Sequence, residues 1–391
     1  MARVCLVNIG SYAALDGTVQ GAYIGGEELQ HALLARMLNR RGVHECSVVT
    51  ARYGPDDGTL VEGIRVYGAY DPAAGLPLVR YVHPRWTGLV RAMRRADADV
   101  YYVSCAAGNT GHVLTWARVM GRASLFRIAS DGDCIPARML ISGRAARAWF
   151  EFGLGCADVI SAQSEHQRQL LKANYGLDAA IAPLVHEDPG RPLALGERDI
   201  DVLWVANLWP WKRPELFVEI ARALPRLRFH LVGGPAPGHE SLAEQLRAAA
   251  CAASNLTLHG RLGYHETAAL FTRSRLFVNT SIIEGFPNTF IQAWSHGAPV
   301  VSFHDPDGII ARHGLGHAAT SATDMAAAVG TLLGNDAAWH SASDRCRAHV
   351  RTRYDPDSTL AIYEAHVDQA LERARRAGRW GTPDRIGGAR R

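Results

Sequence analysis

The chain has 391 residues, of which 48% are apolar and 20% are charged, with 42 basic and 38 acidic residues that leave a formal charge of +4. This length suits two domains, and the composition excludes a disordered protein. The small positive excess argues against a nucleic-acid-binding protein of this size. We therefore expect a soluble globular protein with no nucleic-acid partner.

Short apolar runs alternate with Ala/Leu/Arg-rich helical stretches along the first half of the chain. This alternation predicts an α/β domain with a doubly wound parallel sheet. The expected strands are 4–8, 47–50, 100–104, 125–129, 159–162 and 180–183. The stretch 184–201, LVHEDPGRPLALGERDID, is rich in Pro, Gly and charge, which predicts a linker.

The alternation starts again after the linker and predicts a second sheet. The expected strands are 202–206, 229–232, 256–259, 276–278 and 300–303, and the expected helices are 215–223, 240–252, 264–271, 288–295, 324–333 and 356–377. The resulting division is a first domain at 1–192, a second domain at 193–353, a C-terminal helix at 354–378 and a loose basic tail at 379–391.

The cysteines and the first residues indicate a cytoplasmic location. The seven cysteines are odd in number and scattered, and none forms a Cys-x-x-Cys pair, which argues against disulfides and a zinc site. The 17 histidines show no metal-binding spacing. The opening stretch MARVCLVNIG is too short and too β-like for a signal peptide or a spanning helix.

Ligands of doubly wound sheets bind outside the carboxyl ends of the strands, so two such domains predict a site in the cleft between them. Gly25 and Gly26 follow the first strand and begin a helix, where a backbone can approach a phosphate; an ordinary turn is an equal alternative. Lys212, in the loop WPWKRP after the strand VLWVANL, can neutralise a diphosphate, although a surface lysine is the simpler reading.

The stretch 275–301, RLFVNTSIIEGFPNTFIQAWSHGAPVV, carries the most specific signal. It predicts a strand, a polar loop, a helix and a second strand. The helix begins at Asn288 beside Pro287, so its free N–H groups and positive dipole end face the loop that holds Glu284. Gln292, one turn inside the helix, can lean back toward the same place. The pattern predicts an anion site.

Two other patterns are weaker. The run GLGHAA at 314–319 matches a dinucleotide fingerprint, but no strand leads into it, and we discount it. The basic stretch 85–95 suits an anionic membrane surface, but a helix on a domain surface is favoured, so peripheral membrane contact is the less favoured alternative.

The chain resembles the retaining GT-B glycosyltransferases of family 4, which use nucleotide diphosphate sugars. The resemblance covers nearly the whole chain and rests on GGEEL, GCADVISAQSEHQRQLL, VANLWPWKRPELFVEIA, LVGGP, LHGRLGYHETAALF and, above all, EGFPNTFIQAWSHGAPVV. It implies two Rossmann-like domains, an N-terminal one for the acceptor and a C-terminal one for the donor, with the last helix returning to the first domain. It also implies a UDP-sugar as the favoured donor, and no metal or other cofactor.

The resemblance assigns most donor-binding roles. Glu284 matches the glutamate that contacts the donor sugar, and Lys212, next to Arg213, matches the lysine that binds the diphosphate. The remaining matches are the N–H-donating turn of Gly285, Phe286 and Pro287 before Asn288, the phosphate-facing loop at Gly26, and Arg261 near the base. Two positions depart from the family: Gln292 replaces the glutamate that holds the ribose, and Asn207 replaces an arginine before the lysine.

A third departure lies in the first domain, where many members have a histidine after the fourth strand. Here the strand SLFRIAS runs into Asp131 and Asp133. Asp131 can orient the acceptor or sense the transferring sugar, and loop capping is an equal alternative. With Glu165, these two aspartates would form an acidic rim for a hydroxylated or cationic acceptor.

These assignments predict a transferase in which Glu284, Lys212 and Asp131 are the catalytic residues. The alternative is a sugar-nucleotide-binding partner subunit with weak or no activity. The acceptor is expected to be a glycan precursor or a small natural product, and the oligomeric state is left open.

Overall fold

A computed structural model describes residues 1–17, 23–52, 58–76 and 79–379. The chain forms two compact units. The first consists of 1–16, 27–185 and 357–391, and the second consists of 17–26 and 186–356. Both units are built on parallel sheets, so the predicted α/β class is confirmed. Most of the predicted basic tail, 380–391, lies outside the described residues.

The first unit is built on an eight-stranded sheet in the order β3-β4-β2-β1-β5-β6-β7-β8. Its strands are β1 (Arg3–Val7), β2 (Glu45–Thr50), β3 (Thr59–Val61), β4 (Ile64–Gly68), β5 (Val100–Ser104), β6 (Ala123–Arg127), β7 (Val159–Ala162) and β8 (Ala180–Ile181). Its helices are α1 (Tyr12–Leu15), α2 (Gly26–Arg41), α3 (Thr87–Ala96), α4 (Gly108–Val119), α5 (Arg144–Leu154), α6 (Glu165–Tyr175) and α14 (Pro356–Arg376). The six strands predicted here are all present within a few residues.

The hairpin β3–β4 at one edge of this sheet was not predicted. Its two strands are antiparallel and are joined by Glu62 and Gly63, with φ of 47° and 79°. A two-residue turn with positive φ at both positions matches the twist of the strands it joins. The signal in TLVEGIRV is short, and its exposed edge strand lacks a long apolar run.

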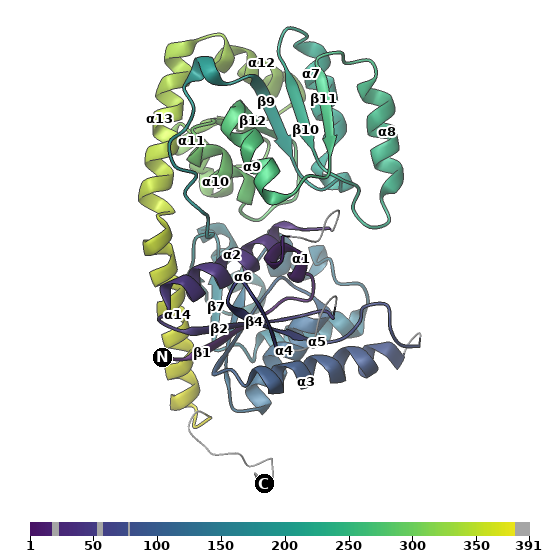
Figure 1. The fold of residues 1–391 in the computed structure, drawn as a ribbon, viewed down its shortest axis with the longest axis vertical. Coiled ribbons are helices and arrows are strands. Elements are labelled where there is room, and N and C mark those ends of the chain that lie inside the picture. Colours follow the sequence, from purple (N-terminus) through teal and green to yellow (C-terminus); the bar gives the residue numbers. More distant parts are fainter. Residues whose placement is uncertain (18–22, 53–57, 77–78, 380–391) are drawn as a thin grey trace. The chain divides into compact units, whose positions relative to one another are not determined.

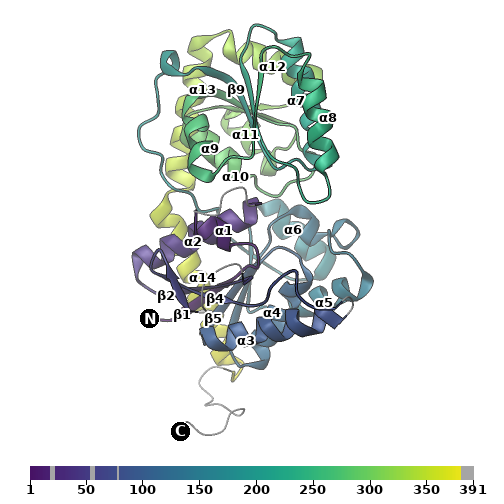
Figure 2. The same cartoon turned by 45° about the vertical axis from the view of Figure 1, so that its right-hand side comes forward.

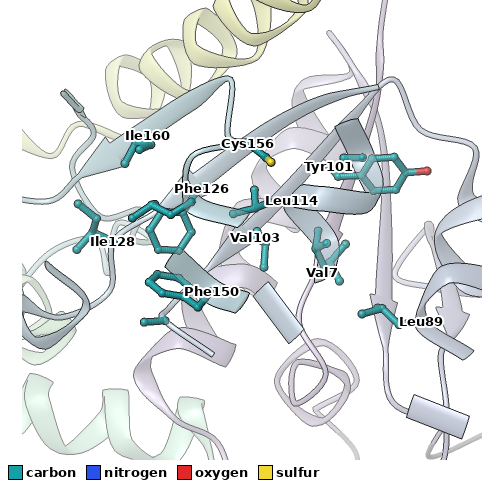
Figure 3. Close-up of a cluster of buried hydrophobic side chains, with 14 of the residues drawn as sticks. Val7, Leu89, Tyr101, Val103, Leu114, Phe126, Ile128, Phe150, Cys156 and Ile160 are labelled. Atoms are coloured by element: carbon teal, nitrogen blue, oxygen red, sulfur yellow. The ribbon is translucent and has the colours of Figure 1, made fainter. Parts of the chain in front are cut away.

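The core of the first unit lies between the sheet and helices α4 and α5 (Figure 3). Val103 and Phe126 point from β5 and β6 toward Leu114 of α4 and Phe150 of α5. The rings of Phe126 and Phe150 are 5.7 Å apart in an edge arrangement. Because burying an apolar side chain of this size stabilises a fold by about 1.5–3 kcal/mol, this contact helps to fix α5 on the sheet.

The second unit is built on six parallel strands in the order β11-β10-β9-β12-β13-β14. The strands are β9 (Ile200–Val205), β10 (Phe229–Val232), β11 (Leu256–Gly260), β12 (Ser274–Asn279), β13 (Val300–Ser302) and β14 (Gly316–Ala318). The helices are α7 (Pro214–Ala223), α8 (Glu240–Ala250), α9 (Tyr264–Arg273), α10 (Asn288–Ser295), α11 (Ile309–His313), α12 (Ala322–Leu333) and α13 (Asp336–Arg353). All five predicted strands are present; α11, α13 and β14 were not predicted.

The strand order of the second sheet sets the place of its site. Counted along the chain, the order is 3-2-1-4-5-6, in which the chain direction across the sheet reverses between the first and fourth strands. Those two strands are β9 and β12, which pair with each other at the centre of the sheet. Loops that leave their carboxyl ends diverge and leave room for a ligand.

The C-terminal helix α14 belongs to the first unit. Tyr363 donates from its hydroxyl to the carbonyl oxygen of Pro183 at 3.0 Å, and Ser161 of β7 lies 2.8 Å from the His366 ring. This helix corresponds to the one expected at 354–378. None of the helices in the described part of the chain is long and apolar enough to cross a membrane.

Candidate functional site

Lys212 and Glu284 meet at the centre of the second sheet. Lys212 ends a short helical turn in the loop after β9, and Glu284 lies in the loop after β12. The Lys212 ammonium donates to Glu284 Oε1 at 2.6 Å, with 18% and 11% of the two side chains exposed. Two of the predicted site residues therefore meet in one ion pair at the switch point of the sheet.

The chain after β12 holds this pair in place. Asn279 donates from its side-chain amide to Glu284 Oε1 at 3.2 Å and accepts from the Ser281 N–H at 2.8 Å. Thr280 donates from its hydroxyl to the Lys212 carbonyl oxygen at 2.6 Å and accepts from Trp204 at 3.0 Å. These contacts fix the two loops to each other.

Glu284 is ionised in this setting. Burial alone would raise the pKa of the Glu284 carboxyl, but the Lys212 charge and hydrogen bonds from Lys212, Ser281 and Asn279 hold that pKa below its ordinary value. The carboxylate thus stays negative at neutral pH and can act as an acceptor for hydroxyl groups.

Helix α10 begins beside Glu284, as predicted, and its residues Asn288–Ser295 match the predicted helix. Pro287 precedes its first turn, and no side chain among the described residues caps that turn. Phe286 is buried against Tyr354 and the α10 residue Trp294, with ring centroids 5.6 and 6.3 Å away. The Gly285 carbonyl oxygen lies 2.7 Å from His304 Nε2. The turn is thus anchored by its side chains, while the N–H groups of the first helical turn point out of it.

The segment 23–26 joins this site from the N-terminal part of the chain. Asn288 donates from its side-chain amide to the Gly26 carbonyl oxygen at 2.8 Å, and Asn207 donates to the Ile24 carbonyl oxygen at 2.9 Å. A Cβ on Gly26 would lie 2.9 Å from the Asn288 amide nitrogen. The structure therefore brings Gly26, Asn207 and Asn288 together.

Arg261 contacts Asn207 directly. Its guanidinium donates to Asn207 Oδ1 at 3.1 Å and to the Pro235 carbonyl oxygen at 2.7 Å, and it lies over the Tyr23 ring at 5.4 Å. A positive charge therefore lies beside Asn207, on the loop after β11. Tyr23 was not among the predicted site residues, because its contacts join distant parts of the sequence.

The side chains of Gln292 and Arg213 make fewer contacts with the other predicted site residues. Gln292 is half-buried in α10, and the described residues give its side-chain amide no hydrogen-bond partner. Arg213 has a positive φ of 50° before α7, and its guanidinium lies over the Phe303 ring at 5.7 Å and 3.9 Å from Glu215. Within the described part of the chain, no hydrogen bond or ion pair joins Arg213 to Glu284.

The three predicted acceptor residues all lie in the first unit and differ in their burial and in their hydrogen-bond partners. The buried Asp133 accepts the N–H groups of Ala129 and Ser130 at 2.8 and 3.1 Å, and burial raises the pKa of its carboxyl to about 6. Asp133 therefore caps its own loop and does not form a rim. Asp131 accepts from Gln167 at 3.2 Å, and Glu165 is exposed.

A buried charge cluster in the first unit was missed. Glu27, at the start of α2, pairs with the buried Arg127 at 3.1 Å and accepts from the Ser104 hydroxyl, while His31 lies 3.3 Å away. Burial would raise the pKa of Glu27, but Arg127, His31 and Ser104 lower it to about 2. The GGEEL motif contains Glu27, but nothing in it points to an arginine a hundred residues later.

The described residues contain no group of three or more His, Cys, Asp or Glu side chains arranged to hold a metal ion. The charges gathered at the site are instead those of Lys212, Glu284 and Arg261.

Comparison with known families agrees with this geometry. Residues 199–335 match the family described as Glycosyl transferases group 1. This segment contains Lys212, Arg261 and Glu284 together with the loops that carry them. A search of curated proteins finds no significant match.

Solved structures resemble the chain along nearly its whole length. Sucrose-phosphate synthase from Thermosynechococcus elongatus has 16% sequence identity and a TM-score of 0.76, with 95% of this chain and 100% of that chain covered. HepE from Anabaena, solved in complex with UDP-glucose, has 15% identity and a TM-score of 0.72, with 94% and 100% covered. A glycosyltransferase from Rickettsia africae has 14% identity and a TM-score of 0.68, with 95% and 99% covered. The chain therefore has the GT-B fold.

Proposed function

We propose that this chain is a retaining glycosyltransferase that moves a sugar from a nucleotide diphosphate donor, with UDP favoured, to a hydroxyl of a polar acceptor. The observation that carries the proposal is the Lys212–Glu284 pair, 2.6 Å apart on the loops after the two central strands of the second sheet. The match of residues 199–335 to Glycosyl transferases group 1 supports it. The UDP-glucose of the HepE complex supports the choice of nucleotide.

In the proposed reaction, positive charge and N–H groups of the second unit stabilise the departing diphosphate. The Lys212 ammonium and the N–H groups at the start of α10 act where negative charge develops on the leaving oxygen. The bond from the anomeric carbon to that oxygen breaks while the acceptor hydroxyl attacks from the same face. The diphosphate oxygen takes the acceptor proton, so the sugar keeps its configuration and no separate base is needed.

Two residues take modified roles in this proposal. Arg261 supplies the second positive charge for the diphosphate, because its guanidinium lies 3.1 Å from Asn207, which replaces the usual arginine. Gln292 holds the ribose through its amide oxygen, and neutral hydrogen bonds are weaker than charged ones by roughly 1 kcal/mol. We propose that these cationic groups make a metal ion unnecessary.

On the acceptor side we propose Asp131, whose carboxylate is partly exposed and is oriented by Gln167. Asp131→Asn should then lower transfer to the acceptor while leaving donor binding unchanged. Unchanged transfer by this variant would exclude Asp131 from the reaction. We also propose that the enzyme acts in the cytoplasm, since all seven cysteines are unpaired.

The chain offers a sharp test because Lys172 and Lys212 are its only lysines. After reductive methylation with ¹³C, the side-chain NMR signal of Lys212 should shift on titration with UDP, whereas that of Lys172 should not. Lys212→Met should weaken UDP binding by roughly 10- to 100-fold, the value of a charge-assisted hydrogen bond. Lys172→Met, which removes the other ammonium, is the matched control.

Measurements of ligand binding and of activity on the purified protein distinguish an enzyme from a binding subunit. A thermal-shift screen with UDP-, GDP-, dTDP- and ADP-sugars should identify the donor, because a ligand of the native state raises its melting temperature. Release of sugar from the bound donor above background, or transfer to a hydroxyl acceptor, indicates an enzyme. Binding without either reaction indicates a partner subunit, and binding of no nucleotide sugar would refute the proposal.

A further inference from the structure

The first unit exposes a row of aromatic and aliphatic side chains outside the site described above. Tyr81, Val82 and Trp86, just before α3, are 59%, 54% and 37% exposed, and Phe152 of α5 is 58% exposed. Single exposed apolar residues are common on protein surfaces, but several that adjoin one another mark an interaction site.

Ring contacts connect Trp86 to Phe152 through His112 and Trp149. Trp86 lies 5.4 Å from His112 of α4, and His112 lies 5.3 Å from Trp149 of α5. Trp149 stacks on Phe152 at 5.6 Å. Helices α3, α4 and α5 lie side by side in both views (Figures 1 and 2). The ring contacts therefore run in one row from Trp86 to Phe152, and Tyr81 and Val82 precede Trp86 in the chain by five and four residues.

Close packing of α4 and α5 keeps this row fixed. A Cβ on Gly111 of α4 would lie 2.5 Å from the Trp149 carbonyl oxygen, and a Cβ on Gly153 would lie 2.5 Å from Gly111 Cα. Only glycine permits this approach. It holds α5 against α4, with the Trp149 ring beside His112.

Positive charge lies beside Tyr81 and on the following helix α3. Between residues 72 and 96 the chain has five arginines and no acidic residue. The guanidinium groups of Arg80 and Arg85 lie over the Tyr81 ring at 5.8 and 5.3 Å. Arg91 and Arg94 are exposed on α3, whose other face is buried.

We infer that this basic aromatic surface, formed by Tyr81, Val82, Trp86 and Phe152 with Arg91 and Arg94, docks on a membrane that contains anionic lipid. Tryptophan and tyrosine prefer the level of the lipid headgroups, where an apolar ring and a polar edge are both accommodated. Arginines around them are attracted to the negative surface potential of anionic lipids. The combination is that of a protein lying on a membrane surface.

This inference goes beyond the proposed function and does not depend on it. The basic aromatic surface belongs to the first unit, whereas Lys212 and Glu284 belong to the second. Membrane docking and nucleotide binding are therefore measured separately, and failure of one leaves the other intact.

The test is co-sedimentation with vesicles of phosphatidylcholine alone or mixed with phosphatidylglycerol. The wild-type protein should pellet with the mixed vesicles, and binding should fall as salt is raised, because salt screens surface charge. Arg91→Gln with Arg94→Gln should weaken binding roughly 30-fold, since each cationic residue near such a surface contributes about fivefold. Tyr81→Ser with Val82→Ser should also weaken binding to the mixed vesicles, and this loss of binding should depend less on the salt concentration.

A matched control removes two positive charges from another part of the protein. Arg351 and Arg353 are exposed on α13 of the second unit, and Arg351→Gln with Arg353→Gln should bind mixed vesicles as the wild type does. All variants should keep the circular dichroism and the UDP binding of the wild type. If the wild-type protein does not pellet with the mixed vesicles, the inference is overturned, and a protein partner becomes the occupant to test for this surface. Equal loss of binding in the α13 control also overturns it, because attraction would then follow net charge alone.

Discussion

Lys212 and Glu284 neutralise each other in the structure at 2.6 Å. A diphosphate that approaches Lys212 competes with Glu284 for the same ammonium. Under the proposed function, Glu284 should disfavour an anion that arrives without a sugar, because only a donor sugar whose hydroxyls bind Glu284 would replace the lost contact. We therefore predict that the pair favours complete nucleotide sugars over free nucleotides.

This argument predicts opposite effects on binding and on reaction for Glu284→Gln. The variant should bind UDP at least as tightly as the wild type, because Lys212 no longer has a charged partner. Its transfer rate should fall about 100-fold or more, as is typical when one positioned transition-state contact is removed. Calorimetry with UDP and initial rates with the identified donor measure the two quantities. A loss of UDP affinity equal to that of Lys212→Met would show instead that Glu284 only holds the loop in place.

The buried pair of Glu27 and Arg127 acts on stability. The pKa of Glu27 is lowered from an ordinary 4.5 to about 2. A carboxyl with a depressed folded-state pKa stabilises the fold fully above its unfolded-state pKa, and this contribution is lost as the pH falls through the folded value. The shift corresponds to roughly 3 kcal/mol at neutral pH.

Glu27→Gln should therefore be destabilised at neutral pH by roughly 3 kcal/mol or more, because Arg127 is left buried without its counter-charge. The difference from the wild type should shrink as the pH falls from about 4.5 toward about 2. Urea unfolding over a pH series measures this difference. Glu45→Gln, at an exposed glutamate in the same unit, should change stability by less than about 0.5 kcal/mol at every pH. A pH-independent difference for Glu27→Gln would contradict the charge argument.

At the scale of elements, the sequence predicts what repeats locally. Helix α10 matches its predicted bounds because Pro287 begins it and the His296-Gly297 pair ends it. The buried parallel strands are continuous apolar runs and were found for that reason. Helix α13 (Asp336–Arg353) was missed because its sequence, DAAWHSASDRCRAHVRTR, has few apolar residues and only a thin buried stripe.

The fingerprint-like run 314–319 now has a structural explanation. Its second glycine, Gly316, begins β14, with a φ of 144°, and a Cβ there would lie 1.8 Å from the Val300 carbonyl oxygen. The glycine permits β14 to approach β13. The rejection of this run as a dinucleotide site agrees with that role, although the strand itself was not predicted.

Gly316→Ala should consequently break the pairing of β13 with β14. The added methyl group meets backbone that cannot move aside, so we expect destabilisation of about 3 kcal/mol or more, in the range of severe backbone strain and overpacking. Gly196→Ala is the matched control, because a Cβ at Gly196 meets no atom within 4 Å. Thermal unfolding compares the two variants. Similar melting temperatures for both would mean that β14 does not depend on this contact.

At the scale of the whole molecule, long-range contacts are what the sequence could not supply. The first domain was expected at 1–192 without interruption, but residues 17–26 belong to the second unit. Tyr23 accepts the Trp209 ring N–H at 3.2 Å and packs on Arg261. Both partners lie more than 180 residues from Tyr23 in the chain. A loop of this kind has no periodicity, so only the fold shows where it binds.

The same holds for α14, which follows the second unit in sequence but completes the first in space. Arg373 donates to the Asp158 carbonyl oxygen at 2.6 Å, and Arg41 pairs with Asp357 at 2.9 Å. With Tyr363 bound to Pro183, these contacts join α14 to segments that come 180 or more residues earlier in the chain.

Removal of residues 355–391 should therefore loosen the first unit and spare the second, although the cut lies at the end of the second. The deletion exposes the residues around β7 and β8 that α14 covers. The hydrogen bonds of those two strands should then open more often. Hydrogen exchange read peptide by peptide should show faster exchange in β7 and unchanged exchange in β9 and β12, which serve as the internal control. Tyr363→Phe, which removes only the hydroxyl bound to Pro183, should give a smaller change in the same strands, equivalent to about 1 kcal/mol. Faster exchange of β9 in the truncated protein would show that the stability of the second unit depends on α14 as well.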